Sequence, residues 1–241
     1  NTVFEDMFDW LDLTLEVICI HPETLFVIRA HPDELRVRKA SRETVAAWVE
    51  ASGIGFTAGA CIVENCVVDN TPGVGIYRYR GAISATHSTV IRDCTIQHTG
   101  STGILYERDE VRGTHVIEDC LLLDVANNPG AIGGNGHAGH GIRFSGAGDG
   151  VDITIRRCTI DTVGIGSTND GGGGIRVGEL DTDITSGAIH VSDTRILDAT
   201  RYGTYIEIGS ATFQNVEVQN VALTIGLYYR YNNALSCLVE D

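Results

Sequence analysis

Two short β-prone phrases alternate along most of this chain of 241 residues. One is centred on a cysteine, as in Val116-Ile-Glu-Asp-Cys120. The other begins with a glycine, as in Gly141-Ile-Arg-Phe-Ser145, and its copies start 28, 38, 33 and 29 residues apart. Both phrases alternate at period two and are rich in Ile and Val, which predicts strands rather than helices. Recurrence at this spacing, with insertions of variable length, predicts a solenoid in which successive copies stack.

The cysteine of the first phrase occupies the same place in four copies. Later copies carry Thr194 and Val216 there. A position that accepts Cys, Thr or Val is a small packing site, where a free thiol behaves as a small hydrophobe. The chain has no Cys-x-x-Cys pair of the kind that holds zinc. The sequence therefore predicts an inward column of unpaired thiols, formed by Cys66, Cys94, Cys120 and Cys158.

Stacking at the ordinary strand spacing of about 4.8 Å aligns equivalent residues of the glycine phrase in columns. Positions one and three after each glycine are expected to point inward, and positions two and four outward. The inward columns are Ile76, Ile104, Ile142, Ile175 and Thr204, and then Arg78, Tyr106, Phe144, Val177 and Ile206. The outward columns are Tyr77, Leu105, Arg143, Arg176 and Tyr205, and then Tyr79, Glu107, Ser145, Gly178 and Glu207.

This pattern resembles the right-handed parallel β-helices of the pectate-lyase-like superfamily over about residues 53–241. The resemblance implies a mainly β fold class, a right-handed parallel β-helix solenoid with a short N-terminal α/β capping segment. Solenoids need such caps to cover their open ends.

Residues 1–52 differ in kind and are expected to form a separate segment. They predict two helices, Asn1–Cys19 and Ser41–Glu50, around a short strand. Val27-Ile-Arg-Ala-His-Pro-Asp-Glu34 resembles a fragment of capsule polysaccharide biosynthesis glycosyltransferases, and the resemblance implies that His31 faces a nucleotide-sugar phosphate. A cap of the solenoid and a fragment of another domain both remain open for this segment.

The net charge of −15 makes a nucleic-acid partner unfavourable, because the chain repels phosphates. No apolar run approaches the roughly 20 residues that span a bilayer, so no transmembrane segment is expected. No signal peptide is visible. The solenoid suggests an extracellular or cell-surface location, whereas the N-terminal resemblance suggests a cytoplasmic one.

The outward columns carry residue types that hold acidic sugars. Aromatic faces stack on sugar rings, and the guanidinium fork of Arg pairs with carboxylates. The two longest, Gly-rich insertions before the glycine phrases, Asp124–Gly139 and Asp161–Gly173, border this face. We therefore expect carbohydrate binding by Tyr77, Tyr79, Glu107, Tyr205 and Glu207, and chemistry at His140, Arg143 and Arg176. A face whose arginines only pair with neighbouring acids is the structural alternative.

Two reactions on acidic sugars could use residues of this kind. Gly139-His140-Gly141-Ile142 resembles the Gly-His-Gly of polygalacturonases, but the paired aspartates of that family are absent near Ser101-Thr102. β-Elimination on a uronate needs a cation to neutralise the carboxylate, here Arg143 and Arg176, and a base, here His140. It requires no cofactor; if Ca²⁺ assists, its ligands are expected among Asp149, Asp152, Asp181 and Asp183.

The sequence thus favours a carbohydrate-active protein that acts on or binds an acidic polysaccharide or oligosaccharide. As an enzyme it would be a polysaccharide lyase or a glycoside hydrolase. A non-catalytic, adhesin-like or structural module is the first alternative, and a capsule polysaccharide biosynthesis protein is the second.

Overall fold

The computed structural model describes residues 54–56, 60–78, 88–106, 111–127, 139–145, 147–164, 172–178, 187–207, 209–221, 225–229 and 237–240. These residues form strands and turns and no helix. The predicted mainly β class is therefore confirmed. The expected N-terminal segment 1–52, with its two helices and His31, lies outside the described residues.

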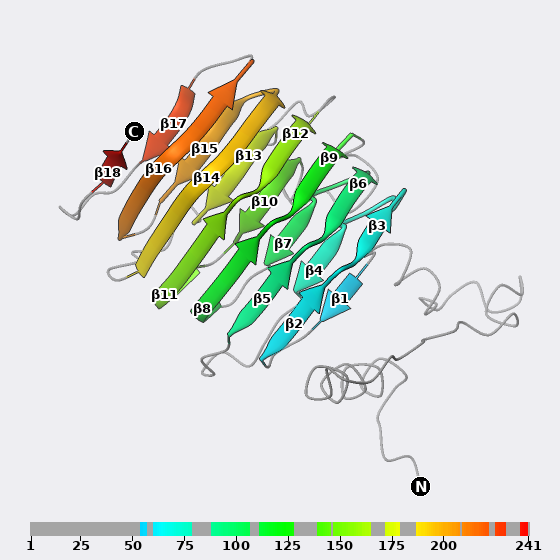
Figure 1. Cartoon of the computed structure of the whole chain (residues 1–241), viewed down its shortest axis with the longest axis horizontal. Helices are drawn as coiled ribbons and strands as arrows, with labels where there is room; N and C mark the ends of the chain where they lie inside the picture. Colours follow the sequence, from blue (N-terminus) through cyan, green and yellow to red (C-terminus); the bar gives the residue numbers. More distant parts are fainter. Residues whose placement is uncertain are drawn as a thin grey trace, which may run out of the picture.

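The described strands form two sheets in which every pair is parallel. The glycine phrases make up the first, seven-stranded sheet, whose spatial order follows the chain (Figure 1). Its strands are β1 (Ile54–Phe56), β4 (Ile76–Arg78), β7 (Ile104–Tyr106), β10 (His140–Phe144), β13 (Gly173–Val177), β15 (Tyr202–Ile206) and β17 (Ile225–Tyr229).

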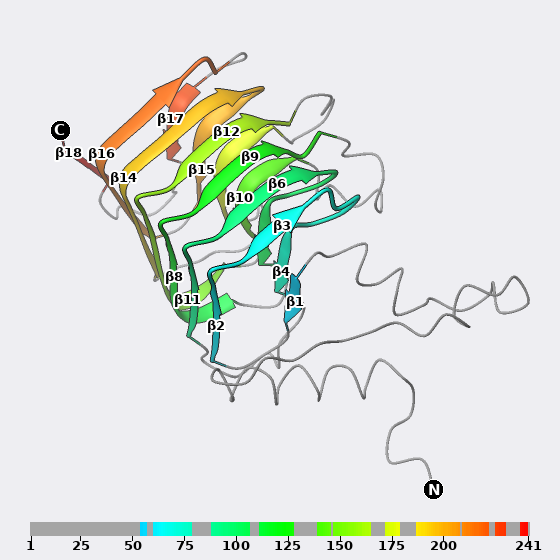
Figure 2. The same ribbon diagram turned by 45° about the vertical axis from the view of Figure 1, so that its right-hand side comes forward.

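The cysteine phrases build the second, eleven-stranded sheet, which is bent into two rows (Figure 2). Its first row holds β2 (Cys61–Glu64), β5 (Thr89–Arg92), β8 (Val111–Glu118), β11 (Ala147–Arg156), β14 (Gly187–Ala199), β16 (Ser210–Gln219) and β18 (Cys237–Glu240). Its second row holds β3 (Val67–Asp69), β6 (Thr95–Thr99), β9 (Leu121–Val125) and β12 (Thr159–Val163), and β12 pairs with the C-terminal half of β14. Each pass of the chain runs through the first row, the second row and the seven-stranded sheet in turn.

Left-handed residues make the bends at both ends of the second row. Their φ values fall between 48° and 57°. Asn and Asp visit this conformation more readily than other non-glycine residues, and they supply most of these positions. The first bend, just before the cysteine site, uses Asn65, Asp93, Asp119, Arg157, Asp193 and Asn215. The second uses Asn70, His98, Asp124, Thr162, Asp198 and Asn220.

The core lies between the two sheets, and the glycines of the glycine phrases set its thickness. Ile142 and Ile175 pair in register and are fully buried, as the inward column predicts. A Cβ on Gly141 would lie 2.5 Å from Cγ2 of Ile160 and 2.6 Å from the backbone oxygen of Gly174. Glycine is therefore needed there because the seven-stranded sheet passes directly over the side chains of the second row.

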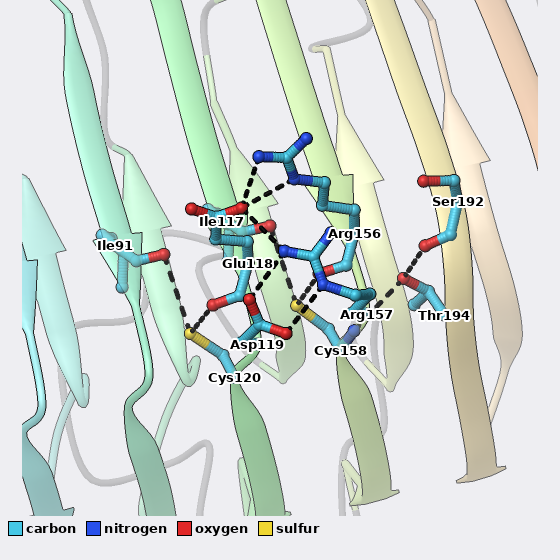
Figure 3. A network of polar contacts seen from close by, with 10 residues as sticks. All are labelled: Ile91, Ile117, Glu118, Asp119, Cys120, Arg156, Arg157, Cys158, Ser192 and Thr194. Carbon is cyan, nitrogen blue, oxygen red and sulfur yellow. Dashed lines mark hydrogen bonds and ion pairs between the residues drawn. The ribbon is translucent and has the colours of Figure 1, made fainter.

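The cysteines form the predicted inward column of unpaired thiols. Cys94, Cys120 and Cys158 are between 1% and 3% exposed, and Cys66 at the end of the column is half-buried. The Cys120 thiol donates to the Glu118 carbonyl at 3.2 Å and approaches the Ile91 carbonyl of the previous pass at 3.8 Å (Figure 3). The column thus satisfies backbone carbonyls at the first bend, where strand pairing is interrupted.

Opposite charges alternate across four passes on the outer face of the first row. The strand register pairs Glu64 with Arg92, Arg92 with Glu118, and Glu118 with Arg156. Arg92 Nε donates to Glu64 at 2.7 Å, and Arg156 Nε donates to Glu118 at 2.7 Å. Figure 3 shows how Arg157 joins the second pair through Glu118 and Asp119. Exposed pairs of this kind contribute little to stability one by one, but their alternation favours this order of passes.

A buried polar chain interrupts the apolar core near the first passes. The Thr89 hydroxyl lies 2.7 Å from the Tyr106 hydroxyl and 2.8 Å from His115 Nδ1, and His115 Nε2 lies 3.1 Å from the Arg112 carbonyl. If Nε2 carries the proton, every bond has a donor: Tyr106 donates to Thr89, Thr89 to His115, and His115 to the carbonyl. Arg78, 3% exposed, places its guanidinium carbon 5.9 Å from the Tyr106 ring centroid.

Candidate functional site

Strand pairing in the seven-stranded sheet aligns the predicted outward residues in one ladder. Tyr77 pairs with Leu105, Leu105 with Arg143, Arg143 with Arg176, and Arg176 with Tyr205. Neighbouring strands lie about 4.8 Å apart, so the two arginines occupy adjacent positions on β10 and β13. The register therefore places four of the predicted site residues, Tyr77, Arg143, Arg176 and Tyr205, in one ladder.

The arginines of this ladder are nearly covered. Arg143 is 4% exposed and Arg176 is 8% exposed, and Leu105 beside them is also buried. The structural alternative, in which these arginines pair with neighbouring acids, stays open. Tyr77, Tyr205 and Glu207 are partly exposed. The partly exposed side chains next to the arginine pair in register are on β15, where Tyr205 pairs with Arg176.

His140 is the first residue of β10 and is completely buried. Burial lowers the pKa of its imidazole well below the usual value, and the guanidinium groups of Arg143 and Arg176 act in the same direction. The ring is therefore neutral at pH 7. The backbone of Gly173, its partner in register on β13, acts on the pKa of the imidazole in the opposite direction. A buried, neutral imidazole has the properties of a proton acceptor.

Tyr202, which was not among the predicted site residues, lies beside His140. It begins β15 and is 6% exposed. The ring centroids of His140 and Tyr202 lie 6.0 Å apart with an interplanar angle of 28°. The signal was present in the sequence: His140 and Tyr202 each immediately precede the glycine of a glycine phrase, and Gly173 holds that place on the strand between them.

Tyr205 contacts both the guanidinium group of Arg176 and the carboxylate of Glu207. The guanidinium carbon of Arg176 lies 5.5 Å from the Tyr205 ring centroid, within cation–π range. The Tyr205 hydroxyl donates to Glu207 Oε1 at 3.0 Å, and the Tyr205 and Tyr202 ring centroids are 5.3 Å apart. We call His140, Arg143, Arg176, Tyr202 and Tyr205 the arginine–tyrosine cluster.

The predicted loops meet beside this cluster. Gly139 ends one insertion and Gly172 stands near the end of the other, and the Gly172 amide donates to the Gly139 carbonyl. Both glycines have positive φ, 89° and 91°. This contact places the C-terminal ends of the two insertions side by side, immediately before β10 and β13. The central parts of both insertions lie outside the described residues.

Several predicted site residues are not placed by the structure. Tyr79, Glu107, Asp181 and Asp183 lie outside the described residues, and the side chain of Asp149 is likewise not described. Asp152 lies on β11 at an exposed position of the other sheet. Over the part of the chain that the structure describes, no three His, Cys, Asp or Glu side chains gather as a metal site. Calcium binding therefore stays a prediction.

Comparison with models of protein families, with curated proteins and with solved structures finds no match for this chain. Among the described residues, no helix has the length and apolar character needed to cross a membrane. Functional inference for this chain consequently depends on the geometry and chemistry of its own residues.

The cluster combines two cations, two aromatic faces and a neutral base in a largely desolvated setting. Charge interactions are stronger there than in water. A carboxylate that reaches both guanidinium groups would offset the repulsion between them, and a sugar ring could pack against Tyr205. The arrangement is thus suited to a ligand that joins a carboxylate to a ring.

Proposed function

We propose that the stacked passes form a right-handed parallel β-helix of the pectate-lyase-like kind. Three observations support this: every strand pair is parallel, spatial order follows chain order, and each pass supplies one strand to the seven-stranded sheet. The sense of winding is the one that parallel crossover connections almost always adopt. In such a solenoid each pass contacts mainly its neighbours, so the ladder at Arg143 is a rigid platform.

The function that this site supports best is binding of an acidic polysaccharide or oligosaccharide. The observation that carries it is the pair Arg143 and Arg176, in register on adjacent strands and almost buried, beside the half-exposed ring of Tyr205. Bidentate guanidinium contacts suit a planar carboxylate, and the aromatic ring suits the apolar face of a sugar. A polymer of this kind points to an extracellular or cell-surface setting.

Binding of uronate oligosaccharides tests this proposal directly. Arg143→Ala should weaken binding by about 10- to 100-fold, the loss expected for a charge-assisted contact, and the loss should shrink as salt is added. Isothermal titration against a panel of uronate and neutral oligosaccharides measures it. Arg195→Ala is the matched control, because it removes the same charge from an exposed pair with Glu217 on the other sheet.

Equal effects of Arg143→Ala and Arg195→Ala would show that only net charge matters and would refute the site. Binding of neutral oligosaccharides as tightly as uronates would refute the role given to the arginines.

We further propose that bound uronate undergoes β-elimination, so that the protein is a polysaccharide lyase. The support is the neutral, buried His140 next to the two carboxylate-neutralising groups. Unsaturated sugar ends, followed by their ultraviolet absorbance, are the expected product. Tight uronate binding with no unsaturated or reducing ends would instead identify a non-catalytic glycan-binding module.

A further inference from the structure

We propose that the outer face of the first row is a docking surface for a second copy of this chain, related to the first by a two-fold axis parallel to the strands. The inference is independent of the proposed carbohydrate function. The strands that carry the surface, β2, β5, β8 and β11, lie side by side in Figure 1. The surface consists of a charge ladder, formed by Glu64, Arg92, Glu118 and Arg156, and of an apolar stripe beside it, formed by Ile62, Val90 and Val116.

The charge ladder is complementary to its own reverse. From β2 to β11 its charges are negative, positive, negative and positive. A two-fold axis parallel to the strands and placed between β5 and β8 reverses this order in the second copy and keeps the strand direction. Glu64 then faces Arg156 of the second copy, and Arg92 faces Glu118 of the second copy. A two-fold interface repeats each contact, so all four positions of the ladder meet an opposite charge.

Other arrangements of two copies do not match the charges. A two-fold axis along the direction of stacking would keep the order of the passes and set Glu64 against its own counterpart. Moving the second copy by one pass would set Glu against Glu and Arg against Arg. Moving it by two passes would leave two complementary positions instead of four. The ladder therefore favours one orientation and one register, and it disfavours the neighbouring ones by repulsion.

The length of the ladder makes this register unique. Arg156 pairs with Ser192 on the next pass, and Ser192 pairs with Gln214 on the pass after that. Both positions are uncharged, so the alternation stops at β11. A longer alternating ladder would allow several registers of similar energy, whereas four charges allow only one in which every charge is matched.

The ladder side chains are accessible from outside. Glu64 and Arg92 are each 43% exposed and Arg156 is 44% exposed, whereas Glu118 is only 12% exposed. Each of the two arginines contacts a carboxylate of its own chain through Nε and Nη2, as Figure 3 shows for Arg156. A guanidinium group has five N–H donors, so it can hold a second carboxylate without losing the first. The contact between Glu64 and Arg156 of the second copy should contribute most, because both side chains are well exposed.

The apolar stripe lies two residues before the charge ladder on the same strands. Ile62 pairs with Val90, and Val90 pairs with Val116. Ile62 is 49% exposed, and both valines are partly exposed. The axis that aligns the charges also sets Val90 against Val116 of the second copy on either side of the axis. The contact would thus have apolar side chains at its centre and charges beside them, an arrangement typical of protein interfaces.

The size of the face indicates a weak dimer. Four strands at about 4.8 Å each span about 19 Å, and the 8 residues of β8 extend for about 26 Å. The face thus covers roughly 500 Å² per copy, or about 1,000 Å² for the pair, which is near the lower limit for a specific interface. We expect a dissociation constant in the micromolar range that rises with salt. The arginine–tyrosine cluster lies on the other sheet, so dimer formation leaves both clusters uncovered.

Two charge-reversed variants of the full chain test the pairing. Arg156→Glu sets a carboxylate against Glu64 of the second copy, and Glu64→Arg sets a guanidinium against Arg156. In sedimentation velocity, each variant alone should have a dimer dissociation constant at least about 10-fold above that of the parent. An equal mixture of the two should form a heterodimer about as tight as the parent dimer, since opposite charges then face each other at both ends. Arg195→Glu is the matched control, because it makes the same change in an exposed pair with Glu217 outside the surface, and it should dimerise like the parent.

A disulfide cross-link tests the orientation. When Val90→Cys and Val116→Cys are mixed and oxidised, they should form far more intermolecular disulfide than either alone, and the parent is the control for the native cysteines. Equal yields would overturn the axis parallel to the strands. A mixture of Arg156→Glu and Glu64→Arg that stays dissociated, or an equal loss in Arg195→Glu, would overturn the charge pairing. A parent protein that stays monomeric at about 1 mM would refute the docking surface and leave the ladder as a set of intrachain pairs.

Discussion

At the scale of single residues, the two bends of each pass depend on an unusual backbone angle. Among the described residues, twelve non-glycine residues at these bends hold it, six at each bend, with φ near 50°. For most side chains this conformation costs about 1–2 kcal/mol, whereas Asn and Asp adopt it more easily and Gly adopts it freely. The Asn and Asp residues before most of the cysteine sites are therefore explained by the positive φ that the bend requires.

Asp93 allows the effect of the positive φ to be tested separately from side-chain contacts. Its side chain is exposed and its φ is 53°. Asp93→Val should lower the free energy of unfolding by about 1–2 kcal/mol because a β-branched residue is strained there. Asp93→Gly should change it by much less. Denaturant unfolding measures both, and equal effects of Val and Gly would contradict the backbone explanation.

At the second bend, His98 and Asp69 form an exposed pair that should make stability depend on pH. His98 Nδ1 lies 2.7 Å from Asp69 Oδ1, and this hydrogen bond raises the pKa of His98 above 6.5 and lowers the pKa of Asp69 below 3.8. The His98 contribution is complete below 6.5 and is lost as pH rises through its folded-state pKa. The Asp69 contribution is lost as pH falls through its own.

We expect Asp69→Asn to return the His98 pKa toward its ordinary value, which an NMR titration of the imidazole protons will show. The six histidines other than His98 and His140 serve as internal references. An unchanged His98 pKa in Asp69→Asn would mean that the pair is not formed in solution.

Thr89 is a third residue whose loss has a definite cost. Its hydroxyl connects Tyr106 to His115 in the interior. Thr89→Val keeps the shape but removes the shared partner of two buried polar groups, so unfolding free energy should fall by about 1–3 kcal/mol. Thr89→Ser keeps the hydroxyl and should cost less. Thermal unfolding compares them, and equal losses would indicate that packing of the methyl group dominates.

At the scale of the strand elements, the buried thiols of the cysteine column should react slowly with alkylating reagents. Contact with the Cys158 sulfur and burial raise the pKa of Cys120 to about 12, so very little thiolate exists at mildly alkaline pH. Alkylation of the folded protein should therefore modify the half-buried Cys66 well before Cys120. Peptide mass spectrometry after timed iodoacetamide treatment measures the order. Equal rates before unfolding would show that the column opens readily.

Strand identity and register were predictable because both repeat in the sequence. The columns headed by Ile142 and Arg143 lie as the spacing of glycines predicts. The left-handed bends were not predicted, although an Asn or Asp precedes the cysteine site in most copies of the phrase. The burial of the two arginines was not predicted, because the alternation of the glycine phrase places them outward, yet they are only 4% and 8% exposed. Tyr202 was not predicted because the glycine phrase was expected to begin at Gly203, whereas β15 begins one residue earlier.

At the scale of the whole molecule, order arises from contacts between successive passes. The sheets contain pairings between neighbouring passes, such as β10 with β13 and β11 with β14. Stability in such an array is approximately a sum of units and the interfaces between them. The arginine–tyrosine cluster spans three passes, through β10, β13 and β15. Its geometry therefore depends on two successive interfaces being intact.

Because charges of opposite sign alternate along the first row, inserting or deleting an odd number of passes differs from inserting or deleting an even number. Glu64, Arg92, Glu118 and Arg156 follow one another across neighbouring strands, so the pattern repeats every second pass. Removing the pass that contains Arg92 would bring Glu64 against Glu118, two like charges on adjacent strands. Removing that pass together with the next would bring Glu64 against Arg156 and restore an attraction. Such a chain can gain passes by duplication, or lose them by deletion, most easily two at a time.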